Sequence, residues 1–216
     1  MRSVIIRNPR HIEPFNEPAS ALSVLNRPLG EWQREQMAPY CNGEIVVGSF
    51  DEIRATGELL VVSDNLWFDA PFLRDFVTEA RRRGRPARVA FRASDPAFLP
   101  QGLGQITRSY ERRGELYFAD LWYLPDGPAA QFEPVILASE AQEMAYFQAP
   151  APTGSLTWWV PQRAVCPVDT WVHLFFANIV FGVFTLAGRA ERRAASAAFR
   201  LRARWRALVE GKPLRA

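Results

Sequence analysis

The clearest pattern of apolar and polar positions lies in the middle of the chain. The continuous apolar run Leu59 to Ser63 is typical of a strand buried on both faces of a parallel sheet. From Ala70 to Arg83 the apolar side chains recur at helical spacing, with Asp69 as the expected N-cap and Gly84 as the expected C-cap. A second strand is predicted from Ala87 to Ala93. Together these segments predict a β-α-β unit, which favours an α/β fold.

Beyond this unit the pattern favours a series of antiparallel strands. They are predicted at Gly104 to Arg112, Glu115 to Leu124, Pro134 to Leu137 and Ser155 to Val165. Aromatic side chains are frequent in this part of the chain. We interpret them as the core of a mixed sheet, and an aromatic platform for a ligand is the alternative.

The uncharged run Trp171 to Gly188 is 18 residues long, which reaches the lower limit for a transmembrane helix. His173 and Asn178 lie within it and would be costly in lipid, so a buried core helix is the favoured interpretation. Residues 189 to 209 then predict a basic amphipathic helix that lies on an anionic membrane, packs on the domain or leads to a further domain. We therefore expect one domain over residues 1–188 and a helical extension over residues 189–216.

Charge is distributed unevenly between these two parts. The chain has a net charge of +3, but residues 1–188 hold 17 basic and 21 acidic residues, whereas residues 189–216 hold 9 and 2. The basicity is therefore local, which argues against a nucleic-acid-binding domain. The two cysteines, Cys41 and Cys166, lie far apart without metal-binding spacing, and the N-terminus lacks the pattern of a signal peptide. These features lead us to expect a cytoplasmic protein.

Candidate chemistry is found where the first predicted strand ends. Asp64 would lie at the carboxyl edge of a parallel sheet, where open α/β folds bind ligands, and a carboxylate there can hold Mg²⁺ against phosphates. A simple turn or helix cap is the competing interpretation. Asp169 and Asp120 are both candidates for a second carboxylate. His173 could pair with Asp169, but a core histidine is the favoured interpretation.

Three segments resemble the sugar-phosphate nucleotidyltransferases, namely Pro18 to Met37, Gly57 to Gly84 and Val168 to Ile179. The second is similar to the strand, acidic turn and helix that carry the metal-binding Asp of this family. The third is similar to the late helix that precedes a left-handed β-helix domain in bacterial members. The resemblance implies an α/β fold: a trimmed, nucleotidyltransferase-like three-layer sandwich with a mixed sheet and a C-terminal helical extension.

The resemblance also implies site residues. The nucleotide-binding candidates are Asn26, Arg27, Asp64 and Asn65, and the candidate Mg²⁺ ligands are Asp64 and Asp169. Family members begin with a Gly-rich loop that contains an Arg and is followed by a Lys, but Met1 to Asn26 holds no Gly and no Lys. The cations that could replace them are Arg7, Arg10 and Arg27.

These departures set the functional expectation. We expect a nucleotidyltransferase-like domain that binds a nucleotide or nucleotide-sugar with weak or no catalysis, because phosphoryl chemistry depends on charge compensation. The alternative is a non-catalytic scaffold or interaction module. It would associate with another protomer, a partner domain or a membrane surface through Trp171 to Gly188 and the Arg-rich helix.

Overall fold

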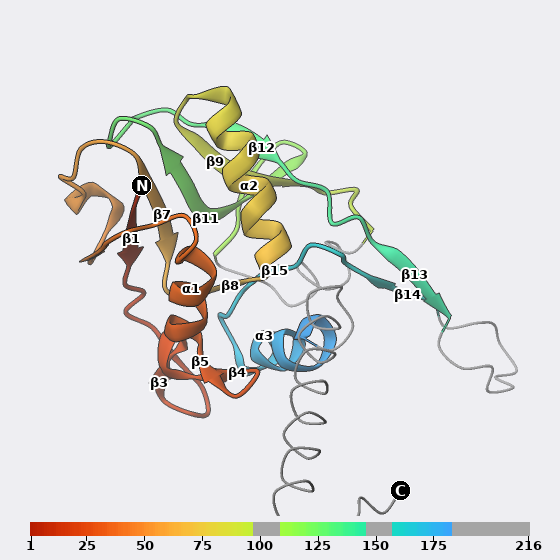
Figure 1. The fold of residues 1–216 in the computed structure, drawn as a ribbon. Coiled ribbons are helices and arrows are strands. Elements are labelled where there is room, and N and C mark those ends of the chain that lie inside the picture. Colours follow the sequence, from red (N-terminus) through yellow and green to blue (C-terminus); the bar gives the residue numbers. More distant parts are fainter. Residues whose placement is uncertain (97–108, 146–156, 183–216) are drawn as a thin grey trace, which may run out of the picture.

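A seven-stranded sheet forms the centre of the molecule (Figure 1), in a computed structural model that describes residues 1–96, 109–145 and 157–182. Its strands are β1 (Arg2–Ile6), β6 (Glu44–Val47), β7 (Leu59–Ser63), β9 (Ala87–Arg92), β10 (Glu111–Arg113), β11 (Leu116–Leu124) and β12 (Glu133–Ile136). The strand order is β12-β9-β11-β7-β1-β6, and β10 pairs with β11. Strands β6, β1 and β7 are parallel, as are β9 and β12, whereas β11 lies antiparallel between β7 and β9. The predicted mixed α/β fold is confirmed.

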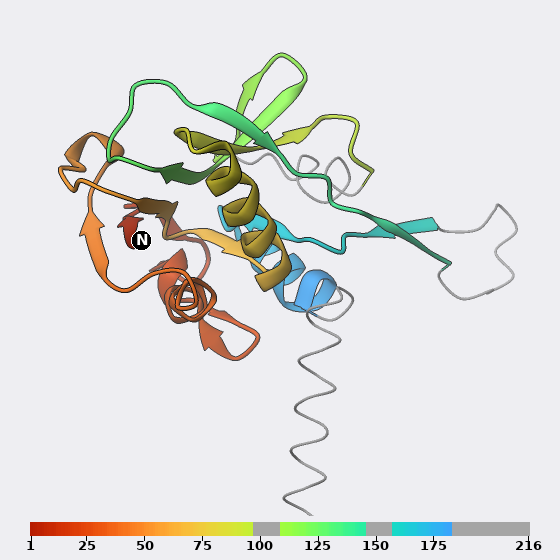
Figure 2. The ribbon, with the colours of Figure 1, turned by 45° about the horizontal axis from the view of Figure 1, so that its top comes forward.

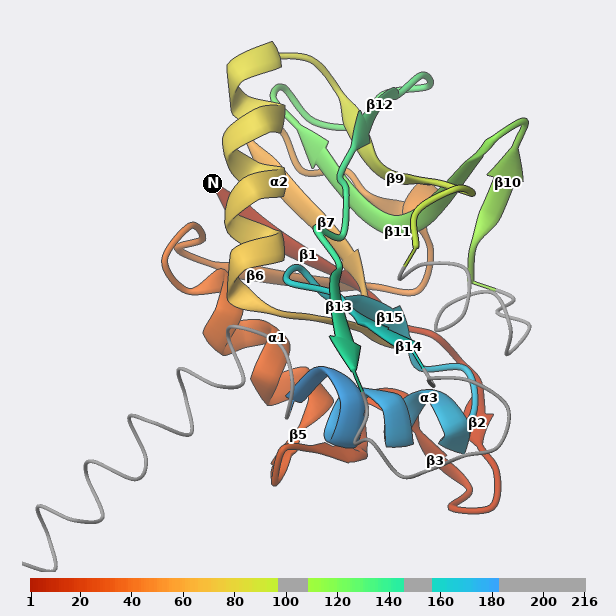
Figure 3. The ribbon, with the colours of Figure 1, turned by 90° about the vertical axis from the view of Figure 1, so that its right-hand side faces the viewer.

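Helix α2 (Ala70–Arg83) covers one face of this sheet (Figures 2 and 3). Its ends follow the local signals, because Asp69 accepts a hydrogen bond from the Phe72 amide at 2.9 Å and Gly84 adopts a left-handed conformation with φ 64°. The buried stripe of α2, which includes Phe76, packs with Leu60, Val62, Val89 and Leu121 of the sheet. The predicted helix and its two flanking strands are therefore confirmed.

The opposite face of the sheet is covered by a turn. Val61 and Trp122 of this face lie in a buried cluster with the 3-10 turn η2 (Phe50–Glu52) and Phe132 against it. The Phe50 ring lies 5.1 Å from the Trp122 ring and 5.5 Å from the Phe132 ring, between centroids. This covering segment is short, as expected for a trimmed fold.

A second layer of short elements lies at the carboxyl edge of β1 and β7. It comprises β2 (His11–Ile12), β3 (Glu17–Pro18), η1 (Ala19–Ala21), β4 (Ser23–Val24), β5 (Arg27–Pro28), α1 (Leu29–Met37), β8 (Leu66–Phe68), β15 (Val165–Pro167), α3 (Trp171–Phe175) and the π-helix η4 (Phe176–Phe181). The hairpin of β13 (Gln142–Ala145) and β14 (Thr157–Val160) projects from the body in Figures 1 and 2. The stacked rings of Trp32, Trp67 and Phe181 form the centre of the second layer, at the carboxyl edge of β1 and β7.

One set of contacts within this layer joins the turn between β4 and β5 to the late helix. Leu25 and Asn26 form the turn between β4 and β5, with φ of 53° and 65°. The Leu25 amide donates to Asn178 Oδ1 at 2.8 Å, and Asn178 Nδ2 donates to the Ser23 carbonyl at 3.2 Å. A Cβ atom on Gly182 would overlap the Leu25 side chain. The hairpin and the late helix are therefore fitted closely to each other.

Several strand predictions need correction. The strand predicted at 134–137 is β12, which is parallel to its partner β9, because β11 already uses both of its edges. The single strand predicted over 155–165 is two strands, β14 and β15, because Pro161 lacks an amide donor and follows β14 directly. Strands β1, β6 and β8 were not predicted. The predicted strand at 104–112 lies mostly outside the described residues, which begin again at Ser109 with β10 following.

The late apolar segment forms a helix with two different faces. Of the residues described, 171–182, His173, Ala177 and Phe181 are buried, whereas Trp171 and Phe175 are about half exposed. None of the helices in the described parts of the chain has the length and apolar character needed to cross a membrane. Residues 183–188 and the predicted extension 189–216 lie outside the described residues.

Candidate functional site

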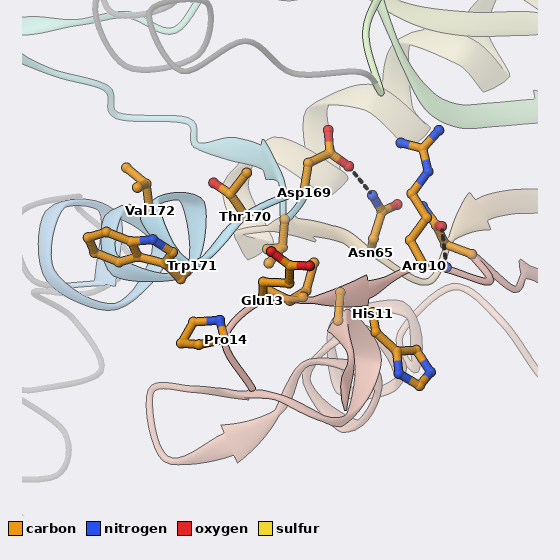
Figure 4. Close-up of a pocket in the computed structure, with 13 residues that line it drawn as sticks. Arg10, His11, Glu13, Pro14, Asn65, Asp169, Thr170, Trp171 and Val172 are labelled. Carbon is orange, nitrogen blue, oxygen red and sulfur yellow. Dashed lines mark hydrogen bonds between the residues drawn. The ribbon is translucent and has the colours of Figure 1, made fainter. Parts of the chain in front are cut away.

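A pocket of about 1020 Å³ lies at the carboxyl edge of β1 and β7, where the second layer meets the sheet. Its lining residues are Asn8, Arg10, His11, Ile12, Glu13, Pro14, Ala19, Asn65, Val168, Asp169, Thr170, Trp171 and Val172. Figure 4 shows Asp169 joined to Asn65 with Arg10 beside them, and Trp171 on the other side of Glu13, close to Pro14 in this view. We call this the Asp169 pocket. Its position is the one at which open α/β sheets bind ligands.

Asp64 lies directly after β7 but does not line this pocket. Its side chain is buried and accepts hydrogen bonds from the Asn8 amide at 2.8 Å and from Ser20 Oγ at 3.1 Å. Burial raises the pKa of the Asp64 carboxyl, and these two hydrogen bonds oppose the shift. Asp64 therefore fixes the loop after β1, which supplies Asn8 and Arg10 to the pocket.

Asn65 and Asp169 are joined in a polar network across the pocket wall. Asp169 Oδ1 accepts from Asn65 Nδ2 at 3.0 Å and from Ser109 Oγ at 2.6 Å, and its Oδ2 accepts from the Ser109 amide at 3.1 Å. Ser63 Oγ donates to Asn65 Oδ1 at 2.7 Å. The structure thus brings together two of the predicted site residues that are 104 positions apart in the sequence.

Within the described part of the chain, His173 makes no hydrogen bond to the Asp169 carboxylate, so the two side chains do not form an acid-base pair. Its Nδ1 accepts from the Asp169 backbone amide at 3.2 Å, and the ring is fully buried. Burial lowers the pKa of His173. The ring holds the segment that leads into α3 through Nδ1, which is the core role favoured from the sequence, and its buried Nε2 has no hydrogen-bond partner among the described residues.

The three arginines expected near the site lie in different surroundings. Arg27 pairs with Glu35 of α1 and is absent from the pocket lining, and Asn26 belongs to the turn that docks beside η4. Arg7 is exposed, and its positive charge lowers the pKa of the Asp64 carboxyl, which favours the charged form. Arg10 is exposed and lines the pocket, and its guanidinium has no ion pair with a carboxylate among the described residues.

Asp120, the alternative second carboxylate, lies on β11. Arg88 Nη2 donates to Asp120 Oδ1 at 2.7 Å, and the Arg88 guanidinium lies 4.9 Å from the centre of the Trp122 ring. Burial raises the pKa of Asp120, and the charge of Asp169 contributes to this rise, whereas Arg88 opposes it. Because Asp120 is already paired with a buried cation, it is a poorer candidate for the metal than Asp169.

The donor set at the site matches the oxygen chemistry of Mg²⁺ only in part. Asp64 and Asp169 supply carboxylate oxygens, and Mg²⁺ accepts one or two carboxylates completed by phosphate and water oxygens. Among the described residues no group of three or more His, Cys, Asp or Glu side chains could hold a metal ion. A nucleotide would therefore have to supply several of the ligands.

Sequence reasoning missed the contributions of Asn8, Thr170 and Trp171 to the pocket. No local motif marks them. The available signal was the short apolar run before Arg7, because reading it as a parallel strand beside β7 would have placed the following loop at the same sheet edge.

Comparison with known proteins identifies similar structures but no relatives in sequence. No family model matches the chain, and no curated protein matches it. Among solved structures it is similar to UDP-glucose pyrophosphorylase from Acinetobacter baumannii, with 8% identity and a TM-score of 0.48 over 92% of this chain and 99% of the other. It is also similar to mannose-1-phosphate geranyltransferase from Thermus thermophilus, with 13% identity and a TM-score of 0.39 over 57% of each chain.

These structures include sugar-phosphate nucleotidyltransferases, the class that the sequence resemblance implied. The chain spans little more than half the length of the Thermus enzyme. At such identities and TM-scores the likeness carries no argument about ligand or activity, so the function has to be argued from the pocket itself.

Proposed function

We propose that the chain binds a nucleotide or nucleotide-sugar in the Asp169 pocket, with weak or no nucleotidyl transfer. The observation that carries the proposal is Arg10, which lines a pocket at the carboxyl edge of parallel strands without an ion-pair partner among the described residues. A guanidinium in this setting suits a phosphate, which it can bind through two parallel hydrogen bonds. The exposed Trp171 ring offers a face on which a base or sugar can stack.

Weak or absent catalysis follows from the charge of the pocket. Among the described lining residues Arg10 is the one arginine, and no lysine is present. Transfer of a nucleotidyl group requires compensation of the charge that develops on several phosphate oxygens. A single cation suffices for binding a phosphate, but it supplies little of the stabilisation that turnover needs.

We propose that Asp169, which lines the pocket, holds Mg²⁺ when a nucleotide brings it, and that Asp64, the other predicted ligand, acts by holding the Asn8 loop. The ion would neutralise phosphate charge there. Asp169 lines the pocket and Asp64 does not, so the two carboxylates can be tested separately.

Isothermal titration of the full chain with nucleoside triphosphates and sugar nucleotides, with and without Mg²⁺, tests the proposal. We expect Arg10→Gln to weaken binding about tenfold, since it removes a charge-assisted contact. Arg92→Gln is the matched control, because Arg92 is exposed and lies outside the pocket lining. No binding at millimolar ligand, or equal affinities of the two variants, would contradict the proposal.

The metal role has its own readout. If Asp169 holds Mg²⁺, Asp169→Asn removes the gain in affinity that Mg²⁺ gives and leaves metal-free binding nearly unchanged. If Asp64 only positions the Asn8 loop, Asp64→Asn weakens binding equally with and without Mg²⁺, and Asp64 is not a ligand.

A further inference from the structure

Gln33 of helix α1 is a buried polar side chain that holds the turn between β7 and β8. It is 1% exposed, and its Nε2 donates to the Ser63 carbonyl at 2.9 Å and to the Leu66 carbonyl at 2.7 Å. An amide nitrogen carries two hydrogens, so both donors of this side chain are used. Because Ser63 ends β7 and Leu66 begins β8, a single side chain joins the two ends of the turn.

The two residues inside this turn, Asp64 and Asn65, are each hydrogen-bonded to a segment that lines the Asp169 pocket. Asp64 accepts from the Asn8 amide at 2.8 Å, on the loop after β1. Asn65 Nδ2 donates to Asp169 Oδ1 at 3.0 Å (Figure 4), and its carbonyl accepts from the Val168 amide at 2.8 Å, on the segment before α3. A displacement of the turn would therefore move groups on both sides of the pocket.

We propose that Gln33 is a positioning residue of the Asp169 pocket, which holds Asn65 in the orientation that directs the Asp169 carboxylate. Gln33 does not line the pocket, so it acts on a bound ligand through the turn. A displaced turn would leave two buried donors of Gln33 unpaired, and this cost confines the turn to one position. The effect on ligand binding rests on the proposed function, whereas the effect on the pocket itself does not.

The substitution Gln33→Met tests this inference, because methionine keeps the length of the side chain and removes both hydrogen bonds. Gln36→Met is the matched control, since it makes the same change in the same helix at a half-buried position outside the pocket lining. If Gln33→Met does not fold, Gln33→Asn takes its place, because the shorter side chain keeps the amide and withdraws it from the two carbonyls by one methylene.

Amide hydrogen exchange of the full chain without nucleotide is the first measurement. The Ser109 amide donates to the Asp169 carboxylate, and the Val168 amide donates to the Asn65 carbonyl. In the Gln33→Met variant we expect exchange at these two amides to accelerate about tenfold more than exchange at the amides of α2, which report the stability of the whole fold. The control variant should exchange like the wild type.

Titration with nucleoside triphosphates and Mg²⁺ is the second measurement. Gln33→Met should weaken binding about tenfold, and the control variant should not. A double-mutant cycle with Asn65→Ala shows whether Gln33 acts through Asn65. Because Asn65→Ala already breaks the connection to Asp169, the loss caused by Gln33→Met should be about threefold or more smaller in that background. A residue that only stabilised the fold would add its full loss.

Two outcomes would overturn the inference. One is exchange at Ser109 and Val168 that accelerates no more than exchange in α2, which would make Gln33 a general contributor to stability. The other is a set of additive losses of affinity in the double-mutant cycle. If the wild type binds no nucleotide, the proposed function fails, and the exchange measurement alone still decides whether Gln33 holds the Asp169 side of the pocket in place.

Discussion

The region around α2 and the region around the Asp169 pocket are stabilised in different ways. In the first, β7, α2 and β9 follow one another directly, and the caps Asp69 and Gly84 adjoin the helix that they end. In the second, the defining hydrogen bonds join Asn65 to Asp169 and Leu25 to Asn178, across 104 and 153 positions of sequence. Local signals mark the elements of the first region, whereas the second depends on contacts, polar and aromatic, between segments far apart in the sequence.

The largest effect is expected from the centre of the first region. Phe76 is fully buried between α2 and the sheet, so Phe76→Ala should lower the free energy of unfolding by about 3–5 kcal/mol. Urea unfolding followed by far-UV circular dichroism measures the loss. Phe15→Ala, at a half-exposed position in the second region, is the control and should stay within about 0.5 kcal/mol. A loss below about 1 kcal/mol at Phe76 would show that α2 contributes less than its burial implies.

Asp69 connects the two regions and should make stability depend on pH. It caps α2 through the Phe72 amide and also accepts from the Ala164 amide at 3.2 Å. Burial raises the pKa of Asp69 to about 7, against 3.8 in the unfolded chain, although both hydrogen bonds oppose the shift. The folded state therefore binds the proton more tightly than the unfolded state. The contribution of Asp69 is complete below pH 3.8 and is lost as the pH rises through about 7.

The free energy of unfolding should fall by about 1 kcal/mol per pH unit from this group between these two values. Urea unfolding of the wild type and of Asp69→Asn at pH 5 and pH 8 isolates it, because the variant lacks the titrating group. An equal fall in both proteins would mean that the pKa of Asp69 is not raised and that other titrating groups cause the fall.

The smallest effect is expected at the hairpin that docks on the late helix. Asn178→Ala leaves the Leu25 amide without its acceptor, which should cost about 1–2 kcal/mol. Hydrogen exchange should accelerate at Leu25 and leave the amides of α2 unchanged. Asn42→Ala, at an exposed asparagine, is the control. Acceleration spread evenly over both regions would show that they unfold as one unit.

The same contrast explains what could be read from the sequence. Helix α2 was predicted with both of its ends, because Asp69, the apolar spacing and Gly84 all act within one segment. Of the site, individual residues were predicted but their arrangement was not. Asp64 and Asp169 were singled out, but their hydrogen-bond partners Asn8, Ser20 and Ser109 come from distant segments that no local pattern marks. The role of Asp64 in holding the Asn8 loop, with Asp169 alone of the two lining the pocket, needed the tertiary structure.

The position of β11 has a consequence for the order in which the chain can fold. Strands β7 and β9 flank α2 in sequence, yet they are not neighbours in the sheet, because β11 occupies the space between them. A nascent chain that ends at β9 therefore has two strands with unsatisfied inner edges and no pairing between them. The sheet becomes continuous only after residue 124 is available. Cooperative folding should thus begin late in synthesis, and shorter fragments should expose strand edges that are prone to association.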